Sequence, residues 1–467
     1  MPITLIQPRH SYADDVWQGH IHLSAPLLSV KARLQAAGIT GIGYIDENVT
    51  PHPSYPQEGV VGINLIGSPY IPVVLDMIKR IPEQVNILLG GQIIWSLTPE
   101  EFDAIFRKNN PRHTIQNGNN PSILAETAGV SAEQIPPVEH VSLEKAYAEI
   151  PDGTLHLYLQ NEFSVYVSQW CKYNCSFCQA AKWQPEIYRD LEWLSAELLF
   201  LATKAVGFWV PSLKFYMSNL DILQTPEKLS DFLDVIEHVQ KTSGIKIYFR
   251  GLAWVESFMQ CYNNHKELLQ RAQKIGLTTI GYGIDGGTPE VWKSIGKVQN
   301  FRKISGNAHF DEQQKAIKTI EFTRELWIQP EILMVFWHPN ETPESLKAGY
   351  NFCQDMHHQF WALPRPHVSK NVIPGARWWR DPRNAKLVRQ FIDDPRLFQA
   401  LDYTALASEL SHEDENLRRQ TNYWYEKICA LDPGSTHVIV PDTPEFRSIA
   451  ESRWLTVRQM NAWKFDR

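Results

Sequence analysis

Three cysteines close together in the middle of the chain could do chemistry. Cys171, Cys175 and Cys178 have the spacing CxxxCxxC, and the aromatic residue Phe177 directly precedes the last of them. Cysteine thiolates hold iron–sulfur clusters, and a cluster of four irons usually takes four such ligands. Three thiolates leave one iron open, where a small molecule could be chelated and receive an electron. The alternative is a zinc site, but no fourth cysteine or histidine follows at the spacing of a zinc finger or ribbon.

A regular series of strands and helices surrounds these cysteines. The apolar stretch 163–168 predicts a strand that leads directly into them, and the pattern then repeats. We expect strands at 213–217, 245–250, 278–284 and 330–337, and helices at 192–205, 226–241, 265–275, 311–326 and 342–354. Short apolar strands that alternate with helices predict an α/β fold with a parallel sheet. In barrels of this class, the chemistry lies where loops leave the C-terminal ends of the strands.

The ordered motifs between 161 and 380 resemble those of the radical S-adenosylmethionine (radical SAM) enzymes. In that family, three cysteines at this spacing hold a 4Fe-4S cluster. The resemblance implies that the open iron binds SAM, and that reduction cleaves SAM to a 5'-deoxyadenosyl radical. Two later stretches add to it: His338–Thr342 stands where many relatives have Gly-Pro-Gly-Glu-Thr, and Val372–Gly375 resembles their Tyr-Pro-Gly-Thr. The resemblance further implies a partial (β/α)₆ barrel, with the cluster loop after its first strand.

The same resemblance implies which residues contact SAM. Phe177 would pack beside the adenine. Ser218 and Asn219 follow a strand where relatives contact the SAM amino group, although the Gly-Gly-Glu pattern of those relatives is absent here. Arg250 would face the SAM carboxylate, which a guanidinium can bind bidentately; its alternative is a surface ion pair. Asp285 stands in place of the usual glutamate and would accept a ribose hydroxyl, but with a shorter reach.

Residues 1–110 resemble the cobalamin-binding domain that precedes the barrel in one large subclass of radical SAM enzymes. The resemblance begins with Pro26-Leu27-Leu28, at the start of a predicted helix. It implies a doubly wound, Rossmann-like sheet. We expect helices at 26–37, 69–80 and 98–107, with Thr98 as the N-cap of the last, and strands at 40–46, 60–66 and 85–89.

Small residues follow two of these strands and are candidates for cobalamin binding. They are Gly67 and Ser68 after one strand, and Gly90, Gly91 and Gln92 after the next. A flat corrin ring needs backbone close by and no side chains in its way, which glycine provides. The C-terminal edge of a parallel sheet is also where ligands usually bind. The alternative is that the two adjacent glycines form only a tight turn between a strand and a helix.

A histidine motif found in many cobalamin proteins is missing. Those proteins ligate cobalt from below with Asp-x-His-x-x-Gly, whereas Asp46 is followed here by Glu47 and Asn48. His20 and His22 do not fit the pattern either. We therefore expect the lower face of cobalt to be open, bound by water or shielded by a side chain.

The length and these motifs predict several domains. We expect a cobalamin-binding-like Rossmann domain over 1–120, a linker over 121–160, a radical SAM partial barrel over 161–384 and a helical C-terminal domain over 385–467. The cysteines outside the triplet, Cys261, Cys353 and Cys429, are isolated and expected to be small buried hydrophobes.

Composition excludes other classes of function. The formal net charge is -7 and there is no basic block, which argues against nucleic acid as a partner. No apolar run reaches eighteen residues and no secretory signal is visible, so we expect a cytoplasmic protein without a membrane span.

The leading hypothesis is a cobalamin-dependent radical SAM methyltransferase that acts on an unactivated carbon of a small-molecule or peptide substrate. Its cofactors would be a 4Fe-4S cluster, SAM and cobalamin, with an external electron donor of the flavodoxin or ferredoxin type. A second hypothesis keeps these cofactors for ring closure or rearrangement without methyl transfer. A third is a non-catalytic relative whose N-terminal domain only senses cobalamin. The sequence identifies neither the substrate nor a general base.

Overall fold

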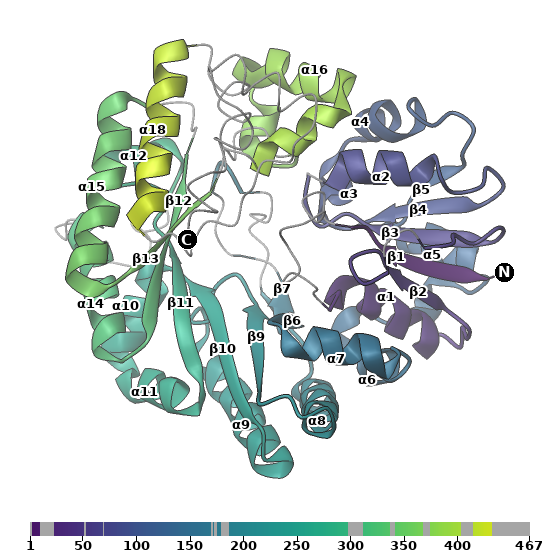
Figure 1. Cartoon of the computed structure of the whole chain (residues 1–467), viewed down its shortest axis with the longest axis horizontal. Coiled ribbons are helices and arrows are strands. Elements are labelled where there is room, and N and C mark those ends of the chain that lie inside the picture. The colour runs from purple at the N-terminus through teal and green to yellow at the C-terminus, as the bar shows by residue number, and fades with distance from the viewer. Residues whose placement is uncertain are drawn as a thin grey trace.

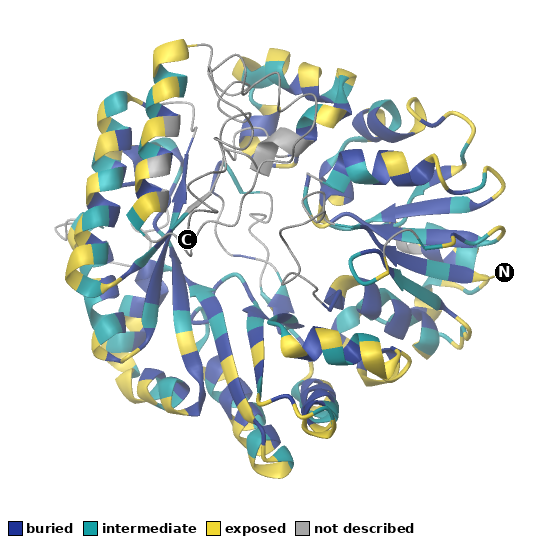
Figure 2. Cartoon of the chain, viewed as in Figure 1, coloured by how far each residue is buried: buried dark blue, intermediate teal, exposed yellow. Residues whose placement is uncertain are grey.

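The computed structural model describes residues 2–9, 23–50, 53–68, 70–169, 171, 175–178, 186–297, 312–336, 341–367, 374–402 and 414–431. Two parallel sheets form the two halves of the molecule (Figure 1). Most strand residues are buried, whereas the outer faces of the helices are exposed (Figure 2). No helix in the described ranges is both long and apolar enough to cross a membrane.

The first sheet has the strand order β2-β1-β3-β4-β5, and all its strands are parallel. Its strands are β1 (Ile3–Gln7), β2 (Gly43–Asp46), β3 (Val60–Asn64), β4 (Asn86–Gly90) and β5 (Ile115–Asn117). Its helices are α1 (Ala25–Ala36), α2 (Tyr70–Ile78), α3 (Gln92–Ser96), α4 (Pro99–Phe102), the π-helix η1 (Asp103–Arg107) and α5 (Pro121–Ala128). The three strands and three helices expected here are all present, and Thr98 accepts the N–H of Glu101 in a capping box, as expected.

Helices cover both faces of this sheet. Side chains alternate along a strand, so neighbouring residues enter different cores. Leu5 packs toward α1 and α5, for example, while the next residue, Ile6, packs toward α2 and η1. The sheet is therefore doubly wound, and its C-terminal edge is left to the loops.

The range 121–160, expected as a linker, is largely helical and packed. It holds α5, the short 3-10 helices η2 (Ala132–Gln134) and η3 (Val138–His140), and the helices α6 (Glu144–Ala148) and α7 (Asp152–Gln160). Tyr147 and Tyr158 lie in the core of the second half, and Tyr158 also donates a hydrogen bond to Asp46 of β2 at 2.5 Å. This segment therefore joins the two halves by packing rather than as a loose connection.

The second sheet has the order β13-β12-β11-β10-β9-β6 and is also parallel. Its edge strands, β6 and β13, are not paired with each other in the described part of the chain, so the barrel is open. The strands are β6 (Phe163–Tyr166), β9 (Ser212–Ser218), β10 (Lys246–Ala253), β11 (Leu277–Gly283), β12 (Gln329–Val335) and β13 (Leu363–His367). The helices are α8 (Leu191–Gly207), α9 (Pro226–Ser243), α10 (Val255–Asn264), α11 (Lys266–Ile275), α12 (Pro289–Ser294), α14 (Glu312–Glu325) and α15 (Pro343–Phe360).

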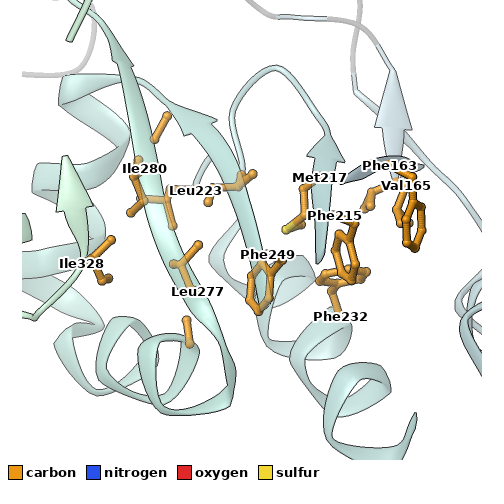
Figure 3. Close-up of a cluster of buried hydrophobic side chains, with 14 of the residues drawn as sticks. Phe163, Val165, Phe215, Met217, Leu223, Phe232, Phe249, Leu277, Ile280 and Ile328 are labelled. Carbon is orange, nitrogen blue, oxygen red and sulfur yellow. The ribbon is translucent and has the colours of Figure 1, made fainter. Parts of the chain in front are cut away.

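Aromatic side chains fill the space between this sheet and its helices. Phe215 and Phe249, on neighbouring strands, stack with ring centroids 5.7 Å apart, and both contact Phe232 of α9 edge-on (Figure 3). Period-two alternation then turns the intervening residues, such as Tyr216 and Arg250, to the opposite, inner face of the barrel. The alternation of apolar residues along these strands thus decides which side chains face the inside of the barrel.

The described part of the C-terminal region is helical, and it packs on both halves. It comprises the 3-10 helices η4 (Arg377–Arg380), η5 (Pro382–Asn384) and η6 (Pro395–Asp402) and the α-helices α16 (Ala385–Asp393) and α18 (Glu415–Leu431). Phe391 and Phe398 join the core beside α2, whereas Tyr425 and Ile428 join that of the second half. In Figure 1, α18 accordingly runs beside α15, while α16 lies toward the first sheet.

Candidate functional site

The cysteine loop leaves the second sheet at the C-terminal end of β6. A short antiparallel pair, β7 (Ser168–Gln169) with β8 (Ile187–Tyr188), closes its base. Cys171 and Cys175 are buried, and Cys178 is half-buried. The loop therefore starts where barrel chemistry is expected.

The three thiols and a buried ion pair share one electrostatic neighbourhood. Burial raises the pKa of the Cys175 thiol; the Lys297 ammonium opposes that rise, and the charges of Cys178, Asp285 and Cys171 add to it. In the described ranges, no three histidine, cysteine, aspartate or glutamate side chains are gathered tightly enough to hold a metal ion as they stand.

Two distant segments clamp the middle of the loop at Ser176. Its backbone N–H donates to the carbonyl of Ile295 at 3.1 Å, and its carbonyl accepts the N–H of Trp378 at 3.3 Å. Arg377 donates from Nη2 to the Ser176 hydroxyl at 2.8 Å. Gly296 has φ 74°, and a Cβ there would lie 3.0 Å from the same hydroxyl oxygen. This close packing fixes the loop backbone between its second and third cysteines.

Asp285 lies under the cysteine loop and is already engaged. It forms an ion pair with Lys297, and both side chains are buried, with exposed fractions of 9% and 2%. Lys297 also donates to the carbonyl of Gly283, and its Nζ lies 4.6 Å from the centroid of the Trp254 ring. The ribose contact expected of Asp285 would have to coexist with this pair, and it stays a prediction.

The other residues expected to contact SAM, Phe177, Ser218 and Asn219, have contacts of different kinds. Phe177 packs against Trp378, with ring centroids 6.1 Å apart. Ser218 ends β9 and lines the cavity described below, while the side chain of Asn219 accepts the N–H of Asp221 at 2.7 Å. These positions surround the cysteine loop and the end of β9, and their roles stay predictions.

Arg250 is held inside the barrel. It donates to both carboxylate oxygens of Glu162, each at 2.7 Å, and its guanidinium carbon lies 5.0 Å from the centroid of the Tyr216 ring. A second carboxylate, Glu331, lies 3.9 Å from Nη1. The arginine thus forms an ion pair, which was the alternative reading of the sequence, but inside the barrel rather than on its surface.

The glycine edge of the first sheet, Gly62, Gly90, Gly91 and Gly118, has no room for side chains. Gly91 has φ 103°, and a Cβ there would lie 2.4 Å from the carbonyl oxygen of Leu65. A Cβ at Gly62 would lie 2.8 Å from the Leu5 side chain, and one at Gly118 would lie 3.1 Å from that of Leu88. These glycines are therefore tightly packed against their neighbours, and all four line the first cavity described below.

Asn119 locks the same edge in place. Its amide donates to the carbonyl of Gly91 at 2.8 Å and accepts the Gly91 N–H at 3.0 Å. Sequence reasoning missed Gly118 and Asn119, although they stand in the Asn-Gly-Asn-Asn turn after β5. Gly67 and Ser68 instead initiate α2, where their carbonyls accept the N–H groups of 70 and 71, and they line neither cavity described next.

A cavity of about 500 Å³ joins the glycine edge to the second sheet. Its wall includes Gln92 and Trp95 from α3, and Tyr166, Gln169 and Ser218 from the start of the cysteine loop and the end of β9. A neighbouring cavity of about 720 Å³ shares part of this wall and continues to Glu162 and Arg250. Residues from both sheets thus face one continuous space.

A strap, residues 375–380, bridges the two halves beside this space. Its first part contacts the cysteine loop through Ser176, as described above. Its second part binds the first half: Trp379 donates to Glu101 at 2.9 Å, and Arg380 donates to both carboxylate oxygens of Glu101 and to the Ser96 carbonyl. Burial acts to raise the pKa of Glu101, but hydrogen bonds from Arg380, Thr98 and Trp379 outweigh it, and the pKa is lowered.

Several sequence predictions lie outside the described residues. These are His20, His22 and the stretches 338–340 and 372–373. Cys261 and Cys353 are fully buried, as expected for small hydrophobes.

No family model matches this sequence, and a search of curated proteins finds no match. Solved structures do match. The radical S-adenosylmethionine methyltransferase TsrM from Kitasatospora setae, with tryptophan substrate and a SAM analogue bound, has a TM-score of 0.56 at 14% identity, over 83% of this chain and 76% of TsrM. The cobalamin-dependent S-adenosylmethionine radical enzyme OxsB has a TM-score of 0.56 at 12% identity, over 99% of this chain and 75% of OxsB. The chain therefore has the fold of these cobalamin-binding radical SAM enzymes.

Proposed function

We propose that this protein is a cobalamin-dependent radical SAM methyltransferase that modifies an unactivated carbon of a small-molecule or peptide substrate. The observation that carries the proposal is the cavity of about 500 Å³, which faces the glycine edge on one side and the end of β9 and the start of the cysteine loop on the other. A substrate held there would reach both halves of the molecule.

The cysteine loop fits a cluster by the chemistry of its donors. Cys171, Cys175 and Cys178 would hold a 4Fe-4S cluster, which supplies an open iron for SAM and the electron that cleaves it. The contacts of Ser176 keep the loop backbone in place, and Lys297 lowers the cost of negative charge near Cys175. Phe177, Ser218, Asn219, Arg250 and Asp285 remain the proposed SAM contacts.

The glycine edge fits a flat corrin ring because its glycines line the cavity of about 500 Å³ and bring backbone close to it without a side chain. Bound cobalamin would supply the methyl carrier. Gly90 and Gln92 line the cavity, whereas Gly67 and Ser68 are proposed contacts at a greater distance. Asp46 accepts from Tyr158 and Asn48, and we propose that this segment gives cobalt no lower imidazole ligand.

The proposed domains are a cobalamin-binding domain over 1–120, a connecting segment over 121–160, a radical SAM domain over 161–384 and a helical domain over 385–467. The substrate class follows from size, since cavities of this volume hold small molecules. TsrM, whose solved structure contains a tryptophan substrate, supports a small molecule of that scale. The electron would come from a flavodoxin- or ferredoxin-type donor.

The test is anaerobic purification with hydroxocobalamin supplied, followed by iron, zinc and corrin analysis. We expect about four irons per chain and bound corrin. With SAM, a reductant and candidate substrates, methylation yields S-adenosylhomocysteine together with 5'-deoxyadenosine. 5'-Deoxyadenosine alone would point to ring closure or rearrangement. Protein that holds zinc or no metal at the loop would overturn the proposal.

A further inference from the structure

Three tryptophans stand out as the most exposed large apolar side chains of the described chain. Trp209, Trp327 and Trp361 have exposed fractions of 93%, 80% and 68%. Each follows the last turn of a helix and precedes a strand: α8 before β9, α14 before β12 and α15 before β13. Because these strands are parallel, all three residues lie at the N-terminal edge of the second sheet. The cysteine loop follows the C-terminal end of β6 and so starts at the opposite edge of this sheet.

The backbone at these positions favours glycine, not tryptophan. The three tryptophans have φ 60°, 61° and 57°, in the left-handed region that glycine adopts freely. The same edge uses glycine with positive φ before two further strands, Gly244 before β10 and Gly276 before β11. A bulky side chain is therefore kept at three turns where the local conformation disfavours it.

The turns themselves do not need the indole rings. After Trp209, the N–H of Val210 reaches back to the carbonyl of Ala205 at 2.9 Å, and after Trp327 the N–H of Ile328 reaches Thr323 at 3.2 Å. These are the hydrogen bonds of a Schellman motif, in which the buried residue after the left-handed position anchors the turn. The tryptophan side chains add nothing to this anchor and extend into solvent.

Exposed basic residues lie on the turns between the tryptophan turns. Lys241, Lys246 and Lys274 are exposed on the intervening turns, and Arg324 lies beside Trp327. Acidic residues accompany the tryptophan turns: Glu325 is exposed beside Arg324, and Asp355 is exposed near the end of α15, so the positive charge lies on the intervening turns. This local positive charge contrasts with the net charge of -7 of the whole chain.

We propose that this tryptophan edge docks on an anionic lipid bilayer. Indole rings concentrate at the headgroup level of membranes, and lysine and arginine nearby add attraction to acidic lipids. The three rings stand on separate turns along one rim, which suits a broad, flat surface. A protein partner would instead favour anchors gathered in one well-packed centre. Docking by this edge would leave the cavity and the cysteine loop facing the aqueous phase.

The test is flotation of the full chain with large unilamellar vesicles of phosphatidylcholine containing about 30% phosphatidylglycerol. We expect the wild type to float with these vesicles, and the variant W209G/W327G/W361G to bind at least roughly ten-fold more weakly. Glycine suits the left-handed backbone, so the variant should fold and melt at the same temperature or higher. It should also keep its iron and corrin content, since the edge lies away from both.

Trp193 offers a matched control, because it is 43% exposed in the first turn of α8, at the opposite end of the helix from Trp209. W193A should float like the wild type. The charge variant K241E/K246E/K274E should lose binding while all rings are present, and roughly 0.5 M salt should weaken binding by the wild type.

Three results would overturn the proposal. One is a wild type that stays unbound with the anionic vesicles. Another is a triple glycine variant that floats as well as the wild type. The third is a wild type that is dimeric by light scattering and a triple variant that is monomeric, with no lipid binding by either, because the edge would then belong to a second copy of the chain.

Discussion

The glycine edge and the cysteine loop lie at the C-terminal ends of two parallel sheets, yet they are built in opposite ways. The glycine edge presents backbone without side chains of its own, and the Asn119 side chain holds Gly91 through two hydrogen bonds. The cysteine loop depends on three thiols, and on Ser176 being held by segments far along the chain. The glycine edge should therefore be sensitive to added side-chain volume, whereas the cysteine loop should be sensitive to loss of a thiol.

The largest expected effect is loss of one sulfur. C175A should remove iron loading and 5'-deoxyadenosine formation entirely, because two thiolates cannot hold a four-iron cluster. The variant should still bind hydroxocobalamin. Iron analysis, product chromatography and corrin absorbance measure the three properties.

C261A is the matched control, since Cys261 is a buried cysteine in the same half of the molecule. It should keep iron and activity. A C175A protein that still makes 5'-deoxyadenosine would show that the triplet does not carry the chemistry.

The converse change fills space at the glycine edge. G91V should lower corrin content by roughly ten-fold or more, because a Cβ would meet the Leu65 carbonyl at 2.4 Å and force the edge to shift. Iron content should stay at the wild-type level. G129N controls for the positive φ, as Gly129 has φ 73° with open space around it. Unchanged corrin content in G91V would place the ring elsewhere.

A third change tests the buried ion pair beneath the cysteine loop. K297M leaves the Asp285 carboxylate buried without its ammonium, and breaking a buried pair in this way usually costs about 3–5 kcal/mol. Thermal unfolding of the cofactor-free protein measures it. K293M, an exposed lysine in α12, should change stability by less than about 0.5 kcal/mol. Equal effects of the two variants would mean that the pair does not stabilise the site.

The smallest effect is expected at the strap that links the two sites. R380M removes charged hydrogen bonds to Glu101 and should cost about 2 kcal/mol near neutral pH. Because the folded pKa of Glu101 is lowered, this stabilisation is fully present above the unfolded pKa and is lost as pH falls through the folded pKa. The difference between R380M and the wild type should therefore shrink in acid, as measured by denaturant unfolding. R389M, on an exposed arginine of α16 whose partner Asp393 is also exposed, should change stability by less than about 0.5 kcal/mol.

The sequence predicts best what is local. The apolar residues of 60–66 predicted the strand β3. Thr98 predicted the start of α4, and the structure contains the capping box that it forms. The strand β5 was missed because three residues, Ile115–Asn117, carry no pattern. The strand β13 was missed because Leu363–His367 contains two prolines, which only an edge strand tolerates.

The same limit applies to the site. The cysteine spacing can be read because its residues are neighbours in the sequence. The contacts that hold the loop and the strap cannot, since Arg377 lies 201 residues from Ser176 and Arg380 lies 279 from Glu101. Arg250 is an example. Its position in β10 could be predicted from the sequence, but its bidentate partner Glu162, 88 residues earlier, could not.

The strap also works as a spacer of fixed length. Four consecutive residues, Arg377 to Arg380, touch the cysteine loop at one end and the α3–α4 corner at the other. The strap thus spans the gap between the cysteine loop and the α3–α4 corner, in addition to the packing of residues 121–160 between the two halves. Inserting or deleting a single residue in it would retune that gap while leaving both sheets intact.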